Sequence, residues 1–424
     1  MSFLMLYLWS IMDLTPEESR RVEAIKRVNE GEKPADIYHS LKRSKKWFYK
    51  WLKRYRSGQE NWYLDRLKKA YVISNKTDER IENSIVEIRT QLMEGNCESV
   101  KYFPVGPEAI QYQMEKLGYV PVEIPSISTI IRIIKRNNLR MNKKERYKRV
   151  KSKGRHTILA PQYINEIHQM DYVGPRYIKG FGPVNSLHLK DVIGRQVAGF
   201  QYRDKSMNNV IMFLLDYWRS NPIPKYLQVD NGMCFAGHFK HPRSISRFVR
   251  LALQVGIEVI FIAPSKPWMN GTIEEFNKQF DRLFWTREIF TDLEDIQTKW
   301  LKFRRKQNEF QSWKLRDKGL QSIKPIQFLR NDCSINTNKI PLVNGKIHFI
   351  RIVDSNGQIK LLNEQFKVGK EYIGEYIWAT IETGNQQLTI CYKDHKLVVR
   401  NIKRYDYEID ETVNDIDFSI IKSS

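Results

Sequence analysis

The stretch His168-Gln-Met-Asp-Tyr-Val-Gly174 places one aspartate, Asp171, inside a short apolar run that is typical of a β-strand. A second run of this kind ends in an aspartate within Leu227-Gln-Val-Asp-Asn-Gly232. Further along, Glu274 opens an amphipathic run that predicts a helix, Asn270-Gly-Thr-Ile-Glu-Glu-Phe-Asn277. Two strands and a helix, each carrying one acid, predict that three carboxylates meet in one place.

Carboxylates gathered in this way repel one another, by about 4 kcal/mol for a pair about 4 Å apart at an effective dielectric of about 20. A bound cation removes this cost, and ligand sets made only of oxygen suit Mg²⁺ or Mn²⁺. Two such ions, about 3.5–4 Å apart, are the usual arrangement for in-line attack on a phosphodiester. The sequence therefore predicts a metal-dependent enzyme acting on DNA, with Asp171, Asp230 and Glu274 as catalytic residues and as ligands of two ions per active site.

Each of these acids also has an ordinary structural explanation. An aspartate before Asn-Gly, such as Asp230, suits a turn, and Glu274 suits the positive end of a helix. The presence of all three in this succession favours the catalytic interpretation.

The charge of the chain points to a polyanionic partner. Its 424 residues include 71 Lys and Arg against 48 Asp and Glu, a formal net charge of +23. Such an excess predicts binding to nucleic acid, here double-stranded DNA. The 41% of hydrophobic residues and the length predict several folded domains.

The cysteines and the start of the chain predict a cytoplasmic, DNA-associated protein. The four cysteines form no Cys-x-x-Cys motif, which favours a reducing compartment. Cys234, His238 and His241 have loosely ligand-like spacing but lack a fourth partner for zinc. The apolar Ser2–Met12 is too short to span a membrane. A translation start at Met12 is expected because Thr15-Pro-Glu-Glu18 resembles a capped helix start, and a targeting segment is the alternative.

The N-terminal third predicts two helical DNA-binding domains, residues 13–75 and 76–139. In the first, a helix, a turn and a basic amphipathic helix follow one another, as in a helix-turn-helix that enters the major groove. In the second, the third helix again carries its basic residues outward. The alternative is a pair of ordinary helical bundles with charged surfaces. The residues expected to contact DNA are Lys45, Lys46, Tyr49, Lys50, Lys53, Arg132, Lys135 and Arg136.

A basic linker, residues 140–161, follows. Nine basic residues and one acid, Glu145, lie between Arg140 and Arg155. We expect phosphate contacts here from Lys143, Lys144 and Arg146, although a solvated linker is the alternative.

Residues 162–332 predict a mixed α/β core, with three strands followed by alternating helices and strands. The turn patterns of residues 338–406 predict a small all-β barrel, and residues 407–424 a mildly acidic tail. The chain contains no G-x-G-x-x-G or Walker loop, so no nucleotide cofactor is expected.

In these motifs the chain resembles the DDE transposase and retroviral-type integrase superfamily, particularly bacterial insertion-sequence transposases with an integrase-type core. Asp171 matches the first-strand aspartate, Asp230 in Asp-Asn-Gly the second, and Gly271-Thr-Ile-Glu274 the motif that opens the catalytic helix. The resemblance implies an RNase H-like core, two divalent ions, DNA strand transfer and a homo-oligomer on DNA.

The chain departs from that pattern in three ways. Between Asp230 and Glu274 lie 43 residues, which predicts an insertion around Ala236–Arg247. Glu275 stands where many relatives have arginine, so it remains a rival to Glu274. The zinc module of retroviral integrases has no counterpart before the core.

Two residues beyond the motif are further candidates for phosphate contact. Asn277 and Lys278 share a helical face with Glu274, and a plain surface role is the alternative for both. Two other functions also stay open. One is an inactive or domesticated DNA-binding regulator derived from a transposase. The other is a ribonuclease H-type hydrolase, which the helix-turn-helix domains disfavour.

Overall fold

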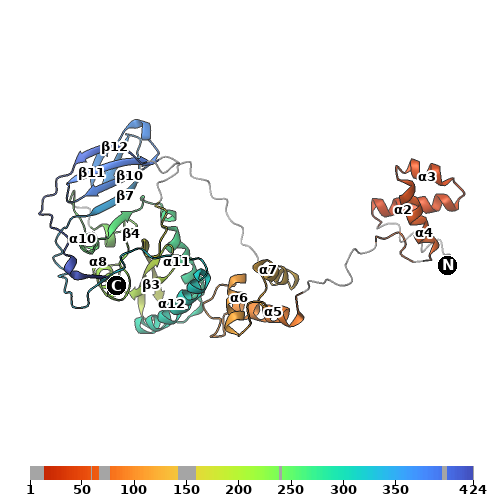
Figure 1. Cartoon of the computed structure of the whole chain (residues 1–424), viewed down its shortest axis with the longest axis horizontal. Helices are drawn as coiled ribbons and strands as arrows, with labels where there is room; N and C mark the ends of the chain where they lie inside the picture. Colours follow the sequence, from red (N-terminus) through yellow and green to blue (C-terminus); the bar gives the residue numbers. More distant parts are fainter. Residues whose placement is uncertain are drawn as a thin grey trace. The chain divides into compact units, whose positions relative to one another are not determined.

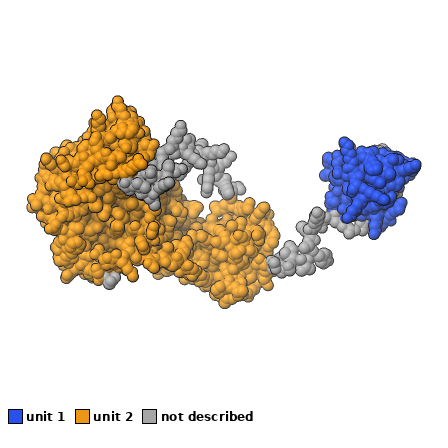
Figure 2. All heavy atoms as spheres, turned by 45° about the horizontal axis from the view of Figure 1, so that its top comes forward, with its two compact units in different colours: residues 1–76 blue, residues 77–424 orange. Residues whose placement is uncertain are grey.

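The computed structural model describes residues 14–58, 60–65, 77–141, 159–237, 241–393 and 399–423. The chain divides into two compact units, residues 1–76 and 77–424, which Figure 2 colours separately. The predictions for Ser2–Met12, for Lys143, Lys144 and Arg146, and for His238 fall outside the described residues. Among the described helices, none is long and apolar enough to cross a membrane.

The described part of the first unit contains three helices: α2 (Pro16–Asn29), α3 (Pro34–Ser40) and α4 (Lys45–Arg56) (Figure 1). Thr15 and Glu18 form a capping box at the start of α2, and the hydroxyl of Ser44 accepts the amide of Trp47 at the start of α4. The buried sides of the helices share one core, made by Ala24, Ile25, Ile37, Phe48, Leu52 and Trp62. The predicted helix-turn-helix order is present at the predicted place.

The second unit begins with three more helices: α5 (Glu79–Glu94), α6 (Pro107–Lys116) and α7 (Ile127–Arg136). Their apolar sides pack together around residues such as Ile85, Ile110 and Ile130. Phe310 joins this cluster from α12 (Leu293–Leu315), a long helix that belongs to the α/β core. The second predicted helical domain is therefore attached to the core by a shared hydrophobic cluster, and α6 and α12 lie side by side in Figure 1.

A mixed sheet forms the centre of the α/β core. Three strands are antiparallel in sequence order: β1 (Ile167–Ile178), β2 (Gly182–Asp191) and β3 (Val197–Tyr202). On the other side of β1, two strands run parallel to it: β4 (Tyr226–Val229) and β5 (Glu258–Phe261). This is the predicted order of strands, with β1 continuing to Ile178 beyond its expected end at Val173.

Helices cover both faces of this sheet. On one face lie α8 (Met207–Ser220) and α10 (Arg247–Gln254), joined by the short α9 (Met233–Ala236). On the other lie α11 (Gly271–Leu283), preceded by η1 (Pro267–Asn270), and α12, preceded by η2 (Trp285–Arg287). Neighbouring residues of a strand face opposite sides. Met170 and Tyr172 therefore enter the core beneath α8 and α10, which leaves Asp171 on the face covered by α11.

The C-terminal strands continue the core sheet, whereas the sequence predicted a separate barrel. The order is β12-β11-β10-β7-β5-β4-β1-β2-β3, in which β7 (Lys346–Ile352) pairs parallel with β5. The remaining strands are β10 (Tyr376–Glu382), β11 (Gln387–Lys393) and β12 (Val399–Asp406), with the hairpin β8 (Gln358–Leu361) and β9 (Glu364–Lys367) beside β7 and η3 (Lys370–Tyr372) after it. The side chains of Val259, Ile260 and Phe261 on β5 are all buried, and this strand is paired on both edges, with β4 on one and β7 on the other.

The end of the chain also returns to the core. Residues 407–424 were expected to form a tail, yet Tyr407 is fully buried. After η4 (Phe418–Ile420), strand β13 (Ile421–Ser423) pairs antiparallel with β6 (Gln327–Leu329). The apolar residues among the acids, including Ile409, Val413 and Ile421, pack against the core, which explains why this segment is ordered.

Candidate active site

The two aspartates lie on neighbouring parallel strands at matching positions. Gln169 of β1 is paired with Gln228 of β4, and each aspartate follows two residues later, Asp171 within β1 and Asp230 immediately after β4. Because side chains alternate along a strand, each glutamine and its aspartate face the same side of the sheet. That side is the one covered by α11, which carries Glu274 in its first turn.

The same two glutamines hold the start of α11. Oε1 of Gln169 accepts the amides of Thr272 and Ile273 at 3.0 and 3.1 Å, and Nε2 of Gln228 donates to the carbonyl of Met269 at 2.9 Å. Both side chains are buried. The strands that carry the aspartates thus also fix the first turn of the helix that carries the glutamate.

The three carboxylates interact electrostatically. The pKa of Asp171 is raised to about 7, chiefly by burial and then by the negative charges of Asp230 and Glu274. An acid held in this state is partly protonated at neutral pH, and a nearby cation would favour the charged form. The structure therefore brings Asp171, Asp230 and Glu274 into one electrostatic group.

Glu275, the rival to Glu274, lies elsewhere. Its charge acts on Lys190 of β2, whose pKa is lowered to about 8, chiefly by burial and then by Arg195, with Glu275 opposing them. Glu275 is exposed, whereas Glu274 is partly buried and acts on Asp171. This placement favours Glu274 as the member of the carboxylate group.

Asn277 is a neighbour of Asp171 and is only 7% exposed, whereas the sequence suggested either a contact with phosphate or a plain surface role. Its Nδ2 donates to Oδ2 of Asp171 at 2.9 Å, and its Oδ1 lies 2.9 Å from Nδ1 of His188. Since Oδ1 can only accept, Nδ1 of His188 carries the proton of that bond. Burial lowers the pKa of His188 to about 4, so this ring is neutral. His188, Asn277 and Asp171 form a chain of hydrogen bonds, while Lys278 is exposed on the next position of the helix.

The donor set near these acids suits a hard cation. Among the described residues, no group of three or more His, Cys, Asp or Glu side chains could hold one metal ion as placed, so shared ligation would require side-chain rotation. The carboxylate oxygens are ligands of the kind that Mg²⁺ and Mn²⁺ prefer. Cys234 lies near Asp230, but burial raises its thiol pKa to about 12, and a protonated thiol is a poor ligand for a soft metal. The carboxylates thus fit a magnesium or manganese site better than a zinc site.

The predicted DNA-contact residues lie mainly on the surface. All five in the first unit are exposed along α4: Lys45, Lys46, Tyr49, Lys50 and Lys53. On α7, Arg132, Lys135 and Arg136 are exposed too. Arg136 is paired with Glu82, and Nε of the arginine donates to Oε1 at 3.0 Å, so it is less free to bind phosphate than its two neighbours.

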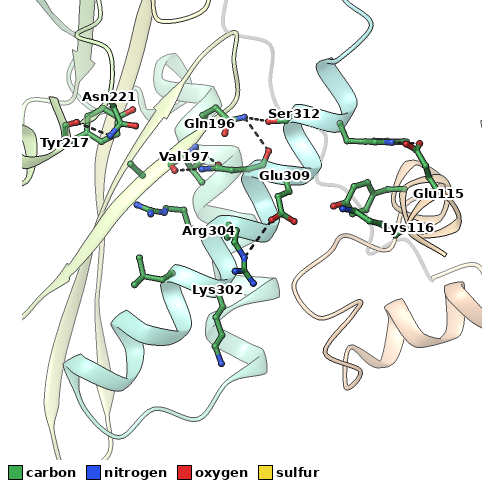
Figure 3. A pocket seen from close by; sticks show the side chains of 16 residues that line it. Glu115, Lys116, Gln196, Val197, Tyr217, Asn221, Lys302, Arg304, Glu309 and Ser312 are labelled. Atoms are coloured by element: carbon green, nitrogen blue, oxygen red, sulfur yellow. Dashed lines mark hydrogen bonds and ion pairs between the residues drawn. The ribbon is translucent and has the colours of Figure 1, made fainter. Parts of the chain in front are cut away.

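One cavity, of about 990 Å³, lies away from the carboxylates. It is bounded by the end of α6, the start of β3, the end of α8 and one side of α12. Figure 3 shows Lys302, Arg304 and Glu309 of α12 on the side opposite Glu115 and Lys116. None of the three acids lines this cavity.

Several supporting residues were not predicted from the sequence. The signal for Gln169 and Gln228 was available, because both aspartate motifs read Gln-x-Asp and a spacing of two places both residues on one strand face. His188 gave no such signal, since its link to Asp171 passes through Asn277 on a distant helix. Helix α12 was also missed.

Comparisons with known proteins agree with this architecture. Residues 15–63 match a family model described as a homeodomain-like domain, and residues 255–311 match one described as an integrase core domain. The second match spans β5, α11 and most of α12, so it includes Glu274 but neither aspartate. No curated protein matches the chain.

Two solved structures are similar to part of the chain. One is the catalytic core domain of BIV integrase, with 15% identity, a TM-score of 0.25 and coverage of 33% of this chain and 81% of that chain. The other is the HTLV-2 integrase catalytic core domain in complex with magnesium, in a dimeric form, with 17% identity, a TM-score of 0.23 and coverage of 30% and 73%. The two domain matches, over residues 15–63 and 255–311, by themselves confirm the predicted resemblance to the DDE transposase and integrase superfamily.

Proposed function

We propose that this chain is a DNA transposase or integrase that binds the ends of a mobile element and catalyses DNA cleavage and strand transfer. The observation that carries the proposal is the burial of Asp171 beside Asp230 and Glu274 in an integrase-type core. A homeodomain-like domain on the same chain supports duplex DNA as the substrate.

Asp171, Asp230 and Glu274 would hold two Mg²⁺ or Mn²⁺ ions, with Asp171 shared between them. Such ions, when bound, lower the pKa of a water molecule and stabilise charge on a leaving oxygen. The protein itself orients these ligands: Asn277 donates to one oxygen of Asp171, and the amide of Gly232 donates to Oδ1 of Asp230 at 2.8 Å. Each of these two aspartates keeps its other oxygen for a cation.

The proposed reaction exchanges phosphodiester bonds. A water oxygen bonds to phosphorus at the element end while the bond to the 3′-oxygen breaks, which releases a 3′-hydroxyl. That hydroxyl then attacks a phosphodiester of the target DNA and displaces another 3′-oxygen. One P–O bond forms and one breaks in each step, so no nucleotide cofactor is required.

DNA would be held mainly by basic residues. Two helices, α4 and α7, and the basic linker supply these contacts, which would neutralise phosphates and give steep salt dependence. Since an element has two ends, we expect at least two copies of the chain to act together. The proposed contact residues are Lys45, Lys46, Tyr49, Lys50, Lys53, Arg132, Lys135, Arg136, Lys143, Lys144, Arg146 and Lys278.

The test uses a supercoiled plasmid that carries the gene with its native flanking DNA, incubated with the full chain and Mg²⁺ or Mn²⁺. Nicking or excision at the element ends is expected for the wild type and should be lost in Asp171→Asn, Asp230→Asn and Glu274→Gln. Glu275→Gln is the matched control on the same helix turn and should cleave normally. Cleavage retained in Glu274→Gln and lost in Glu275→Gln would reverse the choice of glutamate.

A DNA-binding regulator without catalytic activity is the second candidate. One observation favours it: within the described ranges, no three acidic, histidine or cysteine side chains are placed to hold one ion. Tight binding to the flanking DNA, with no strand cleavage in either Mg²⁺ or Mn²⁺, would support the regulator and reject the transposase.

A further inference from the structure

The turn that carries Asp230 is anchored through its neighbour, Asn231. Nδ2 of Asn231 donates to the carbonyl of Ile262 at 2.7 Å, which ties the residue after Asp230 to the chain just beyond β5. Because Asp230 and Asn231 are adjacent, the direction in which Asp230 leaves β4 depends on this attachment. The sequence suggested only that Asn231 serves the turn.

Arg351, from the C-terminal strands, donates hydrogen bonds to both Asn231 and Ile262. Nη2 of Arg351, on β7, donates to Oδ1 of Asn231 at 2.9 Å, and its Nη1 donates to the carbonyl of Ile262 at 3.2 Å. Two further bonds fix the guanidinium itself, to the carbonyls of Lys360 at 3.1 Å and Ile350 at 2.8 Å. One side chain therefore closes a hydrogen-bonded triangle with the amide of Asn231 and the carbonyl of Ile262.

Arg351 is a buried, charged side chain, and packing alone does not explain its burial. It is only 8% exposed, and among the described residues no carboxylate is paired with it. Burial lowers its pKa to about 10, which still leaves it charged at neutral pH. A buried charge without a counter-ion is expensive, and here carbonyl and amide oxygens and the ring of Phe349, 5.1 Å from the guanidinium carbon, compensate it. An apolar residue would pack at this position with less cost.

We infer that Arg351 is a positioning residue for Asp230, and that the C-terminal strands thereby complete the carboxylate site. The inference rests on the proposed function only in treating Asp230 as a metal ligand. Residues that orient metal ligands through a hydrogen bond typically affect metal affinity by about 10–100-fold. The pairing of β7 with β5 places Arg351 at the distance that this contact needs.

The first measurement is hydrogen–deuterium exchange of the full chain, resolved by peptide. Arg351→Gln should raise exchange in residues 230–237 by about tenfold or more while the β10 and β11 strands keep wild-type protection. Arg400→Gln is the matched control, because Arg400 is an exposed arginine of the same strand region. Arg400→Gln should leave hydrogen–deuterium exchange in residues 230–237 unchanged.

The second measurement is Mn²⁺ binding by calorimetry in the absence of DNA. The expected loss of affinity is about 10–100-fold in Arg351→Gln and smaller in Arg351→Lys, which keeps one donor. If Arg351→Gln proves globally unfolded, Asn231→Ala removes the same contact from the other side. Asn231→Ala should then reproduce both effects.

Wild-type exchange and wild-type Mn²⁺ affinity in Arg351→Gln, or in Asn231→Ala where the arginine variant does not fold, would overturn the inference. A different result bears on the proposed function. If the wild type binds no Mn²⁺ and cleaves no DNA, the enzyme proposal fails, and the exchange data alone decide whether Arg351 orders the Asp230 turn.

Discussion

Asn277 donates a hydrogen bond to Asp171 across 2.9 Å, from a position three residues after Glu274 on α11. Residues three apart lie on one side of a helix. Helix α11 therefore supplies two side chains to the carboxylate group, one acid and one amide. The side-chain amide of Asn277 is in turn hydrogen-bonded to His188.

We predict that Asn277→Leu lowers cleavage by about 10–100-fold and leaves duplex binding intact, because the substitution removes the donor to Asp171 at similar volume. His188→Phe should have a smaller effect in the same direction, since it removes only the partner of Asn277. Cleavage rates and DNA affinity measured on the same preparations check this. Weakened DNA binding in Asn277→Leu would instead restore the phosphate contact that the sequence suggested.

The side-chain oxygen of Gln169 should stabilise the fold as a hydrogen-bond acceptor. Gln169→Met leaves the amides of Thr272 and Ile273 without their partner, and each buried unsatisfied donor costs about 1–3 kcal/mol. Gln169→Glu keeps an acceptor oxygen and should lose less. The free energy of unfolding from urea titration distinguishes them, and equal losses in the two variants would contradict this role.

Acid should destabilise the fold through His168, which is fully buried and whose pKa burial lowers to about 4. Its Nε2 lies 3.1 Å from Oδ1 of Asn165. A depressed histidine pKa gives stability that is complete above the unfolded value of about 6.5 and is lost as pH falls toward about 4. At pH 5 the loss amounts to about 2 kcal/mol.

The check compares urea unfolding of the wild type and His168→Gln at pH 7 and pH 5. Other groups, including Asp171 with its raised pKa, titrate in both proteins, so the difference between them isolates His168. The wild type should lose more stability than the variant between the two pH values. Parallel losses would mean that this ring does not remain neutral in the folded state.

Phe310 should hold the second helical domain to the core. It is 2% exposed and belongs to the apolar cluster of α5, α6 and α7, so Phe310→Ala should cost about 3–5 kcal/mol. Leu301→Ala, on the same helix at 46% exposed, should change stability by less than about 0.5 kcal/mol. Thermal unfolding gives the stabilities, and exchange in residues 79–136 should rise only in the phenylalanine variant.

The sequence predicted best what depends on local pattern. Apolar runs and capping residues such as Ser44 predicted the first helices. The motifs around Asp171, Asp230 and Glu274 predicted the two strands and the helix that carry these acids. The contacts that support these acids could not be predicted, because they join segments far apart in the chain. Arg351 lies 120 residues after Asn231, and no local pattern connects the two.

The strand-rich C-terminal segment was predicted, but its place in the core sheet was not. Turn residues and alternating strands describe this segment equally well whether it closes on itself or joins another sheet. In the structure β7 pairs with β5, a core strand far earlier in the chain. No local pattern in the C-terminal segment indicates that partner.

The pairing of β5 with β7 also bears on how the protein is made on the ribosome. Translation delivers β5 well before Lys346–Ile352, and during that interval an apolar strand has an open edge, the kind of surface that invites pairing with other chains. The edge closes, and Arg351 reaches Asn231, only when most of the polypeptide has emerged. An incomplete nascent chain would thus carry Asp171, Asp230 and Glu274 without the hydrogen bond between Arg351 and Asn231.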